Sequence, residues 1–153
     1  MCSEGEALRY TRRISGPLAD RIDLYIAVDR VPLKELVDAE ASESSAAVRA
    51  RVADARGRQH ERNHALGLEV PTNARLHARD LLAACGLSPR RLERARVVAE
   101  RLGLSARAWH RMLRVARTIA DLEGADIVGD PHLLEALRYR RGHDAGVTGR
   151  TPP

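Results

Sequence analysis

The sequence predicts a mainly α-helical protein, a helical bundle preceded by a single β-strand. Aromatic residues make up only 3% of the chain and Phe is absent, so the core has to be built from aliphatic side chains, which suits packed helices. Capping Ser or Asp residues and helix-ending Gly residues recur through residues 75–141. Only one segment alternates apolar and polar residues as a strand does.

The predicted strand lies within residues 1–37, after a break at Ser15-Gly16-Pro17. Ile22, Leu24, Ile26 and Val28 alternate with less apolar residues, which gives residues 22–28 one face to bury. One strand cannot form a sheet, so we expect its partners in another chain or in sequence that this chain does not contain. Residues 1–37 are therefore predicted to be the remnant of a larger α/β core.

Residues 38–74 predict a linker, one helix and a loop. Residues 38–44 are small and polar, and Ser44 or Ser45 can cap a helix that runs to about residue 63. The apolar side of this helix is thin, and Gly67 and Pro71 mark the loop that follows it. Its packed side is predicted to carry Val48, Val52, Ala55 and Gln59, with Arg51, Arg58 and Arg62 turned away.

Residues 75–141 predict a helical bundle. A short helix over residues 77–85 ends at Gly86, with Cys85 buried at its end. Ser88, Ser105 and Asp130 each begin a further helix, and these helices run to about residues 102, 123 and 141. Residues 142–153 are predicted to be a disordered tail. The helix after Ser105 has the clearest apolar stripe, formed by Trp109, Met112, Leu113, Ala116, Ile119 and Ala120.

The composition restricts the function classes. Cys2 and Cys85 are far apart, and no His or Cys spacing matches a zinc site, so no metal site is predicted. No run reaches the roughly 18 apolar residues of a membrane span and no signal peptide is evident, so we expect a cytoplasmic protein with no membrane partner. No GxxxxGK[ST] loop or strand ending in paired acidic residues occurs, so the chain alone is predicted to bind neither ATP nor Mg²⁺ and to be inactive as an ATPase.

Two long motifs carry a family resemblance. RISGPLADRIDL at residues 13–24 and GLSARAWHRMLRVARTIADLEG at residues 103–124 resemble the magnesium-chelatase-like AAA+ ATPases, particularly the competence-type branch known for helicase activity. The shorter matches ESS at 43–45, NARL at 73–76 and LEALRYR at 134–140 fall in the same order. Ala19 departs from the family pattern, since a larger aliphatic residue usually stands there.

The resemblance implies a fold and a function for the full-length protein. It identifies residues 1–37 as the end of an AAA+ core with its last strand, and residues 75–141 as the helical lid. It implies a ring, most commonly a hexamer, that binds ATP and Mg²⁺ and couples ATP hydrolysis to remodelling of DNA. The implied partners are a missing N-terminal ATPase half or homologous subunits, with DNA as a further candidate.

Two arginines receive roles from the resemblance. Arg21 is similar to the family's arginine finger, which reaches the γ-phosphate bound by a neighbouring subunit. Arg107 is similar to the sensor-2 arginine, which contacts phosphate from the lid. From position alone, a surface ion pair of Arg21 with Asp20 or Asp23 and a solvated Arg107 on the polar face of its helix are the alternatives.

A second interpretation makes the chain a stand-alone Arg-rich module that binds nucleic acid without enzymatic activity. The formal net charge is +5, and 25 of the 26 basic residues are Arg. Residues 75–117 contain eleven Arg and three acidic residues, a local net charge of +8. Compositional bias towards Arg explains the bulk charge equally well. Single-strand binders also interleave aromatic residues with basic ones, and this segment offers only Trp109.

Overall fold

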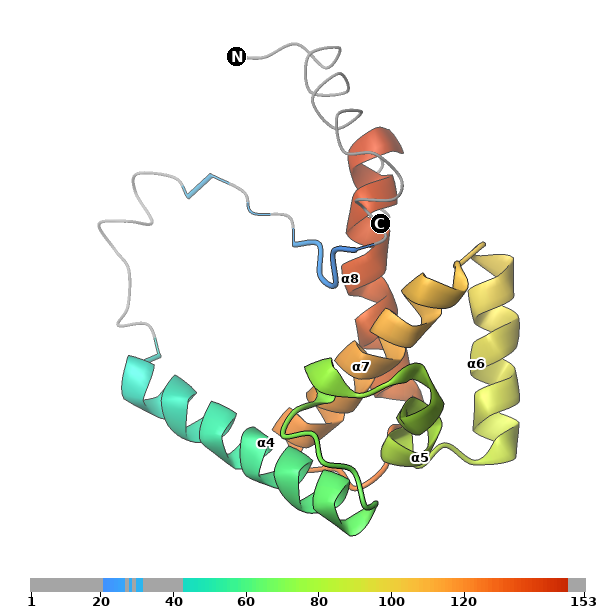
Figure 1. The fold of residues 1–153 in the computed structure, drawn as a ribbon. Helices are drawn as coiled ribbons and strands as arrows, with labels where there is room; N and C mark the ends of the chain where they lie inside the picture. Colours follow the sequence, from blue (N-terminus) through green and yellow to red (C-terminus); the bar gives the residue numbers. More distant parts are fainter. Residues whose placement is uncertain (1–20, 27, 29, 32–42, 149–153) are drawn as a thin grey trace.

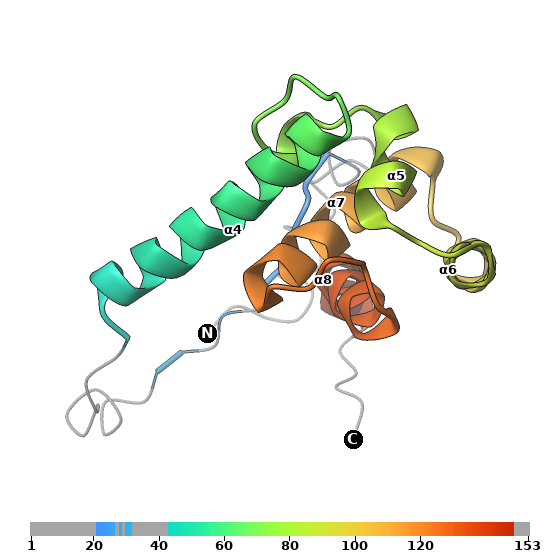
Figure 2. The ribbon, with the colours of Figure 1, turned by 90° about the horizontal axis from the view of Figure 1, so that it is seen from below.

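The computed structural model describes residues 21–26, 28, 30–31 and 43–148, with side chains as far as residue 140. The described part is mainly helical, which confirms the predicted fold class. In both views α7 crosses α8 at the centre, with α4 and α6 on opposite sides of the pair (Figures 1 and 2). The elements are α4 (Ser45–Ala65), the 3-10 turns η1 (Asn73–Arg75) and η2 (Ala78–Asp80), α5 (Leu81–Cys85), α6 (Pro89–Arg101), α7 (Ala106–Glu123) and α8 (Asp130–Thr148).

Local capping explains where these helices begin and end. The hydroxyl oxygens of Ser44, Ser88 and Ser105 each accept a hydrogen bond from a backbone N–H three residues later, at 3.1 to 3.3 Å. Gly86 and Gly124 end α5 and α7 with φ of +61° and +76°, a conformation that residues with a Cβ rarely adopt. The predicted helix starts after Ser44, Ser88 and Ser105 are confirmed.

Two helices differ from the prediction in length. The segment predicted as one helix over residues 77–85 consists of η2 followed by the short α5. α8 continues to Thr148 instead of ending near residue 141, because extending a formed helix requires no new nucleation. The remainder of the predicted tail, residues 149–153, lies outside the described residues.

The apolar core lies where α7 packs on α8. The predicted stripe of α7 is confirmed: five of its six residues are buried, and Trp109 is partly buried against them. Ala116, Ala120 and Ala136 are completely buried and present only a methyl group, so the two helices can approach closely. None of the helices in the described ranges is long and apolar enough to cross a bilayer.

A buried polar network joins α4, η1 and α7. Asp121 is 2% exposed, and its Oδ1 lies 2.5 Å from Nη1 of Arg62 and 3.0 Å from Nη2 of Arg117. Its Oδ2 accepts a hydrogen bond from the Asn73 amide at 2.7 Å. The Gln59 side-chain oxygen accepts from the Asn73 backbone N–H at 3.0 Å. The prediction that Arg62 turns away from the packed side is wrong, because the Asp121 carboxylate offers its charge a buried partner.

The first half of α4 extends away from the bundle, as both ribbon views show (Figures 1 and 2). Residues 45–54 are exposed, and packing begins only at Ala55. Val48 and Val52 are therefore 37% and 38% exposed, although the sequence predicts them on the packed side. The packed side of α4 is instead formed by Ala55, Gln59 and Asn63.

The segment predicted as a strand has no strand pairing among its described residues, 21–26 and 28. The structure therefore does not contain the predicted strand in that part of the chain. A strand is stable only when neighbouring strands satisfy its backbone groups, and no such neighbour lies among the described residues. Residues 1–20 and 32–42 lie outside the described residues, so the assignment of 1–37 to a core remnant stays a prediction.

Candidate functional site

Arg21 stands at the start of the described N-terminal segment. Its side chain is exposed, and it makes no hydrogen bond or ion pair with any other residue that the structure describes. Asp23, one of the two ion-pair partners considered for it, contacts Arg111 on α7 instead. Asp20, the other, lies outside the described residues. The guanidinium of Arg21 is thus accessible from solvent.

The segment just after Arg21 is attached to α7 and α8 by three contacts. The Asp23 carboxylate forms an ion pair with Arg111 of α7. Nη1 of Arg140 donates a hydrogen bond to the carbonyl oxygen of Ile22 at 2.6 Å. The backbone N–H of Tyr25 donates to the carbonyl oxygen of Tyr139 at 2.9 Å. Residues 22–25 are therefore held against α7 and α8, although they pair with no strand.

Arg107 occupies the second position of α7 and is exposed. The N-terminus of an α-helix favours anions, because its first N–H groups lack intrahelical partners and the helix dipole is positive there. Arg111 and Arg114, its neighbours on α7, are both engaged: Arg111 with Asp23, and Arg114 with the carbonyl oxygen of Leu76 at 2.8 Å. Arg107 makes no contact of this kind with a described residue.

Arg117 has a structural position on the same helix. It is 1% exposed, and its two Nη atoms donate to the carbonyl oxygens of Asp126 and Ala125 at 2.9 and 2.5 Å. Burial lowers the pKa of its guanidinium, and the neighbouring Asp121 carboxylate opposes that shift. Arg117 stabilises the turn after α7 and is not available to a ligand.

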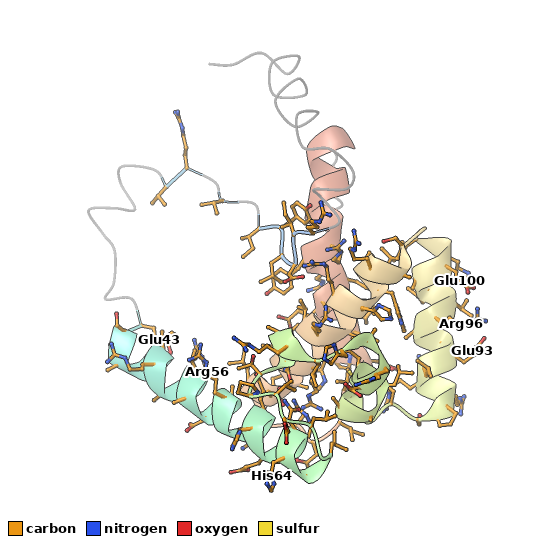
Figure 3. The ribbon with its side chains drawn as sticks, viewed as in Figure 1. Glu43, Arg56, His64, Glu93, Arg96 and Glu100 are labelled. Carbon is orange, nitrogen blue, oxygen red and sulfur yellow. The ribbon has the colours of Figure 1, made fainter. Side chains whose placement is uncertain are left out.

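Most arginines of residues 75–117 have side-chain partners within the described structure. Seven of the eleven arginines in residues 75–117 form an ion pair or a hydrogen bond through their side chains. Figure 3 shows one such group on α6, where Glu93, Arg96 and Glu100 extend from the outer face of the helix. The exposed arginines of this stretch without such a contact in the described structure are Arg75, Arg90, Arg101 and Arg107.

The described side chains include no group of three or more His, Cys, Asp or Glu residues that could hold a metal ion. Cys85 is completely buried, and burial raises the pKa of its thiol to about 12, so it is not a thiolate ligand at neutral pH. Arg21 and Arg107, the two arginines that the family resemblance selects, are both exposed. Guanidinium groups match phosphate oxygens in charge and geometry. They can contact phosphate but cannot cradle it.

Comparison with known proteins identifies relatives for most of the chain. The family model for the C-terminal part of magnesium chelatase subunit ChlI matches residues 42–140, and the model for subunit ChlI itself matches residues 1–36. The uncharacterized protein YifB of Salmonella typhimurium is 44% identical over 91% of the chain. Competence protein ComM of Haemophilus influenzae is 40% identical over 90% of the chain.

The uncharacterized protein Rv2897c of Mycobacterium tuberculosis is a more distant relative, 33% identical over 92% of the chain. The chain spans about a quarter of the length of these relatives, 26% of YifB and ComM and 27% of Rv2897c. The similarity therefore concerns one part of a longer architecture.

Proposed function

The chain belongs to the magnesium chelatase ChlI family, and from that premise we propose that it supplies the arginine finger and the sensor-2 lid of a ring-forming AAA+ ATPase. In this proposal the ATPase half, or a homologous subunit, holds ATP and Mg²⁺. The chain completes that site and is not an ATPase by itself. The ring uses the energy of ATP hydrolysis to remodel DNA. A relative named as a competence protein is consistent with this assignment.

One observation carries the proposal: Arg21 is exposed, while the backbone that follows it is held by three contacts to α7 and α8. A finger has to be solvent-accessible and also held in a defined position. Guanidinium suits the role because it is always charged and can donate two hydrogen bonds to phosphate oxygens. In nucleotide hydrolases such a finger contributes about 10³ to 10⁵ in rate.

Arg107 would act from the lid on the same chemistry. Its place in the first turn of α7 adds a full positive charge to the partial charge of the helix terminus. Binding of the phosphates by the ATPase half would bring Arg107 onto them, and the nucleotide when bound supplies the phosphoryl group that is transferred. The role of Arg107 in this chain is to hold negative charge at the lid side of the site.

Exposed apolar side chains support a partner that covers the N-terminal segment. Leu24, Ile26 and Val28 are 46%, 67% and 87% exposed, which is unfavourable for side chains that face water. Beside them lies a groove of about 750 Å³ between the segment, α4, α7 and α8. A β-sheet of the ATPase half would pair with this segment and bury those side chains.

The test is Arg21→Ala in the ring-forming ATPase that contains this chain, measured as ATP turnover and nucleotide affinity. We expect turnover to fall by about 10³-fold or more, with nucleotide affinity unchanged, because the finger acts only in the transition state. Arg30→Ala is the matched control, since Arg30 is also exposed in the same segment. Turnover near normal in Arg21→Ala would refute the finger assignment.

A further inference from the structure

An ion pair joins the two elements that carry the proposed nucleotide-contacting arginines. Arg111 lies one helical turn after Arg107 on α7, so the two side chains share a face of that helix. Asp23 lies two residues after Arg21, a separation that extended backbone spans in at most about 7 Å. The Asp23 carboxylate contacts the Arg111 guanidinium across 88 residues of sequence.

We propose that Arg111 is the positioning residue for Arg21, and that its ion pair with Asp23 transmits the position of the lid to the finger. This inference rests on the proposed function and adds a regulatory link to it. The proposed finger, Arg21, lies in the N-terminal segment, whereas the proposed sensor-2 residue, Arg107, lies in the first turn of α7. The Asp23–Arg111 pair connects the two within one chain.

The contacts of Arg111 favour a positioning role over a structural one. Side chains of Arg111 and Asp23 are 21% and 56% exposed, so water screens the pair and its contribution to stability is small. The α7–α8 interface is held by buried apolar residues such as Leu113, Ala116 and Ala136, which do not depend on Arg111. Within the described part of the chain, Nε of Arg111 is buried without a hydrogen-bond partner, and Asp23 contacts the guanidinium at Nη1.

The other two anchors do different work. They involve the carbonyl oxygen of Ile22 and the N–H of Tyr25, and both lead to the end of α8 around residues 139–140. Asp23 connects the segment to α7, the helix that carries Arg107, through its ion pair with Arg111. If α7 rotates when Arg107 binds phosphate, the ion pair with Arg111 therefore displaces Asp23, which lies two positions from Arg21. Substituting either Asp23 or Arg111 removes this ion pair between the N-terminal segment and α7.

The experiment uses the ATP-hydrolysing ring with Arg111→Gln, Asp23→Asn, both together, and the exchange Asp23→Arg with Arg111→Asp. We expect each single variant to lower kcat about 10- to 100-fold, since small misplacements of a catalytic group have effects of that size. Nucleotide affinity and Tm should stay unchanged, and cooperativity in ATP concentration should fall towards a Hill coefficient of one. The double variant should be no worse than either single variant, and the exchange should restore part of kcat.

Arg96→Gln is the matched control, because Arg96 also forms exposed ion pairs, with Glu93 and Glu100 on α6, and none of its described contacts reaches residues 21–26. Losses of kcat that simply multiply in the double variant would overturn the coupling, as would normal kcat and cooperativity in both single variants. If Arg111→Gln unfolds the lid, the more exposed Asp23→Asn decides the question. Normal turnover in Arg21→Ala would refute the proposed function itself, so the two failures are distinguishable.

Discussion

Replacing Asp121 with Asn tests the buried polar network that holds α4 on the lid. Asp121 is the only carboxylate within reach of Arg62 and Arg117 among the described contacts, and one of its oxygens serves both guanidinium groups. The side chains of Asp121 and Arg117 are each 1% exposed, and that of Arg62 is 17% exposed. The substitution keeps the size of the side chain and removes only its charge.

The expected loss of stability is about 3 to 5 kcal/mol, the range for removing one partner of a buried ion pair. It lies at the upper end of ordinary substitutions because two buried arginines lose their counter-charge together. A domain of this size has a free energy of unfolding of about 5 to 15 kcal/mol, so the loss is a large fraction of the total. In terms of Tm, it corresponds to a decrease of about 6 to 20 °C for a chain of this length.

Urea unfolding followed by circular dichroism measures this loss, with the midpoint and slope fitted for each variant. Glu100→Gln is the matched control, because it removes the charge of a carboxylate whose ion pair with Arg96 is exposed on α6 (Figure 3). That control should change stability by no more than about 0.5 kcal/mol. Adding Arg62→Met to Asp121→Asn should recover part of the loss, since it removes one uncompensated charge.

An Asp121→Asn loss as small as that of Glu100→Gln would refute the reasoning. It would mean that the guanidinium groups of Arg62 and Arg117 are hydrated or neutralised elsewhere once the carboxylate is gone. A lower unfolding slope with an unchanged midpoint would point instead to a more compact denatured state.

Three further predictions concern other positions. In the unfolded chain Cys85 titrates near 9.0, whereas burial raises the pKa of the thiol to about 12 in the folded protein. Between pH 9 and 12 the unfolded state loses this proton and the folded state keeps it, so the free energy of unfolding should fall as pH rises across that window. The check is to measure urea unfolding midpoints at a series of pH values for the wild-type chain and for Cys85→Ala, in which this dependence should be absent. Gly86→Ala should lower the stability of the protein more than Gly103→Ala, although the two glycines have nearly the same φ, +61° and +63°. Both variants incur strain of about 1 to 2 kcal/mol, but a methyl at Gly86 would also lie 2.9 Å from Cγ2 of Ile127; calorimetry resolves the difference. The isolated chain should not be retained on DNA at low salt, because most arginines of residues 75–117 are engaged; retention that falls linearly with log salt would instead support a stand-alone nucleic-acid-binding module.

The helices could be predicted from sequence because their boundaries are local. Ser88 and Ser105 cap helices through hydrogen bonds that span three residues, and Gly124 ends α7 within one turn. Long-range contacts could not be predicted in this way. Arg62 meets Asp121 across 59 residues, and no pattern near Arg62 identifies that partner. The packed face of α4 includes the polar residues Gln59 and Asn63, and an amphipathic pattern predicts polar residues on the solvent side.

For the candidate site, too, the sequence predicted some of the residues but not their long-range contacts. Arg21 and Arg107 came from resemblance to a family, and their roles stay predictions. The structure adds the contacts around them, above all the Asp23–Arg111 pair across 88 residues. Nothing in the sequence around Arg111 identifies Asp23 as its partner. No local signal distinguishes Arg111 from Arg114, since both lie on the polar face of α7 and their partners come from different distant segments.

Compositional bias and function are therefore not competing explanations for the arginines of this chain. Bias can supply a guanidinium at many positions, but contacts decide what each one does. Arg117 is buried and donates to two carbonyl oxygens, Arg111 is partly buried against one carboxylate, and Arg21 is exposed. A lysine could carry the charge at all three positions, but its donors radiate from one nitrogen, whereas the two Nη atoms of Arg117 reach two separate carbonyl oxygens from one planar group. The shape of the group, more than the net charge of the chain, is what the fold uses.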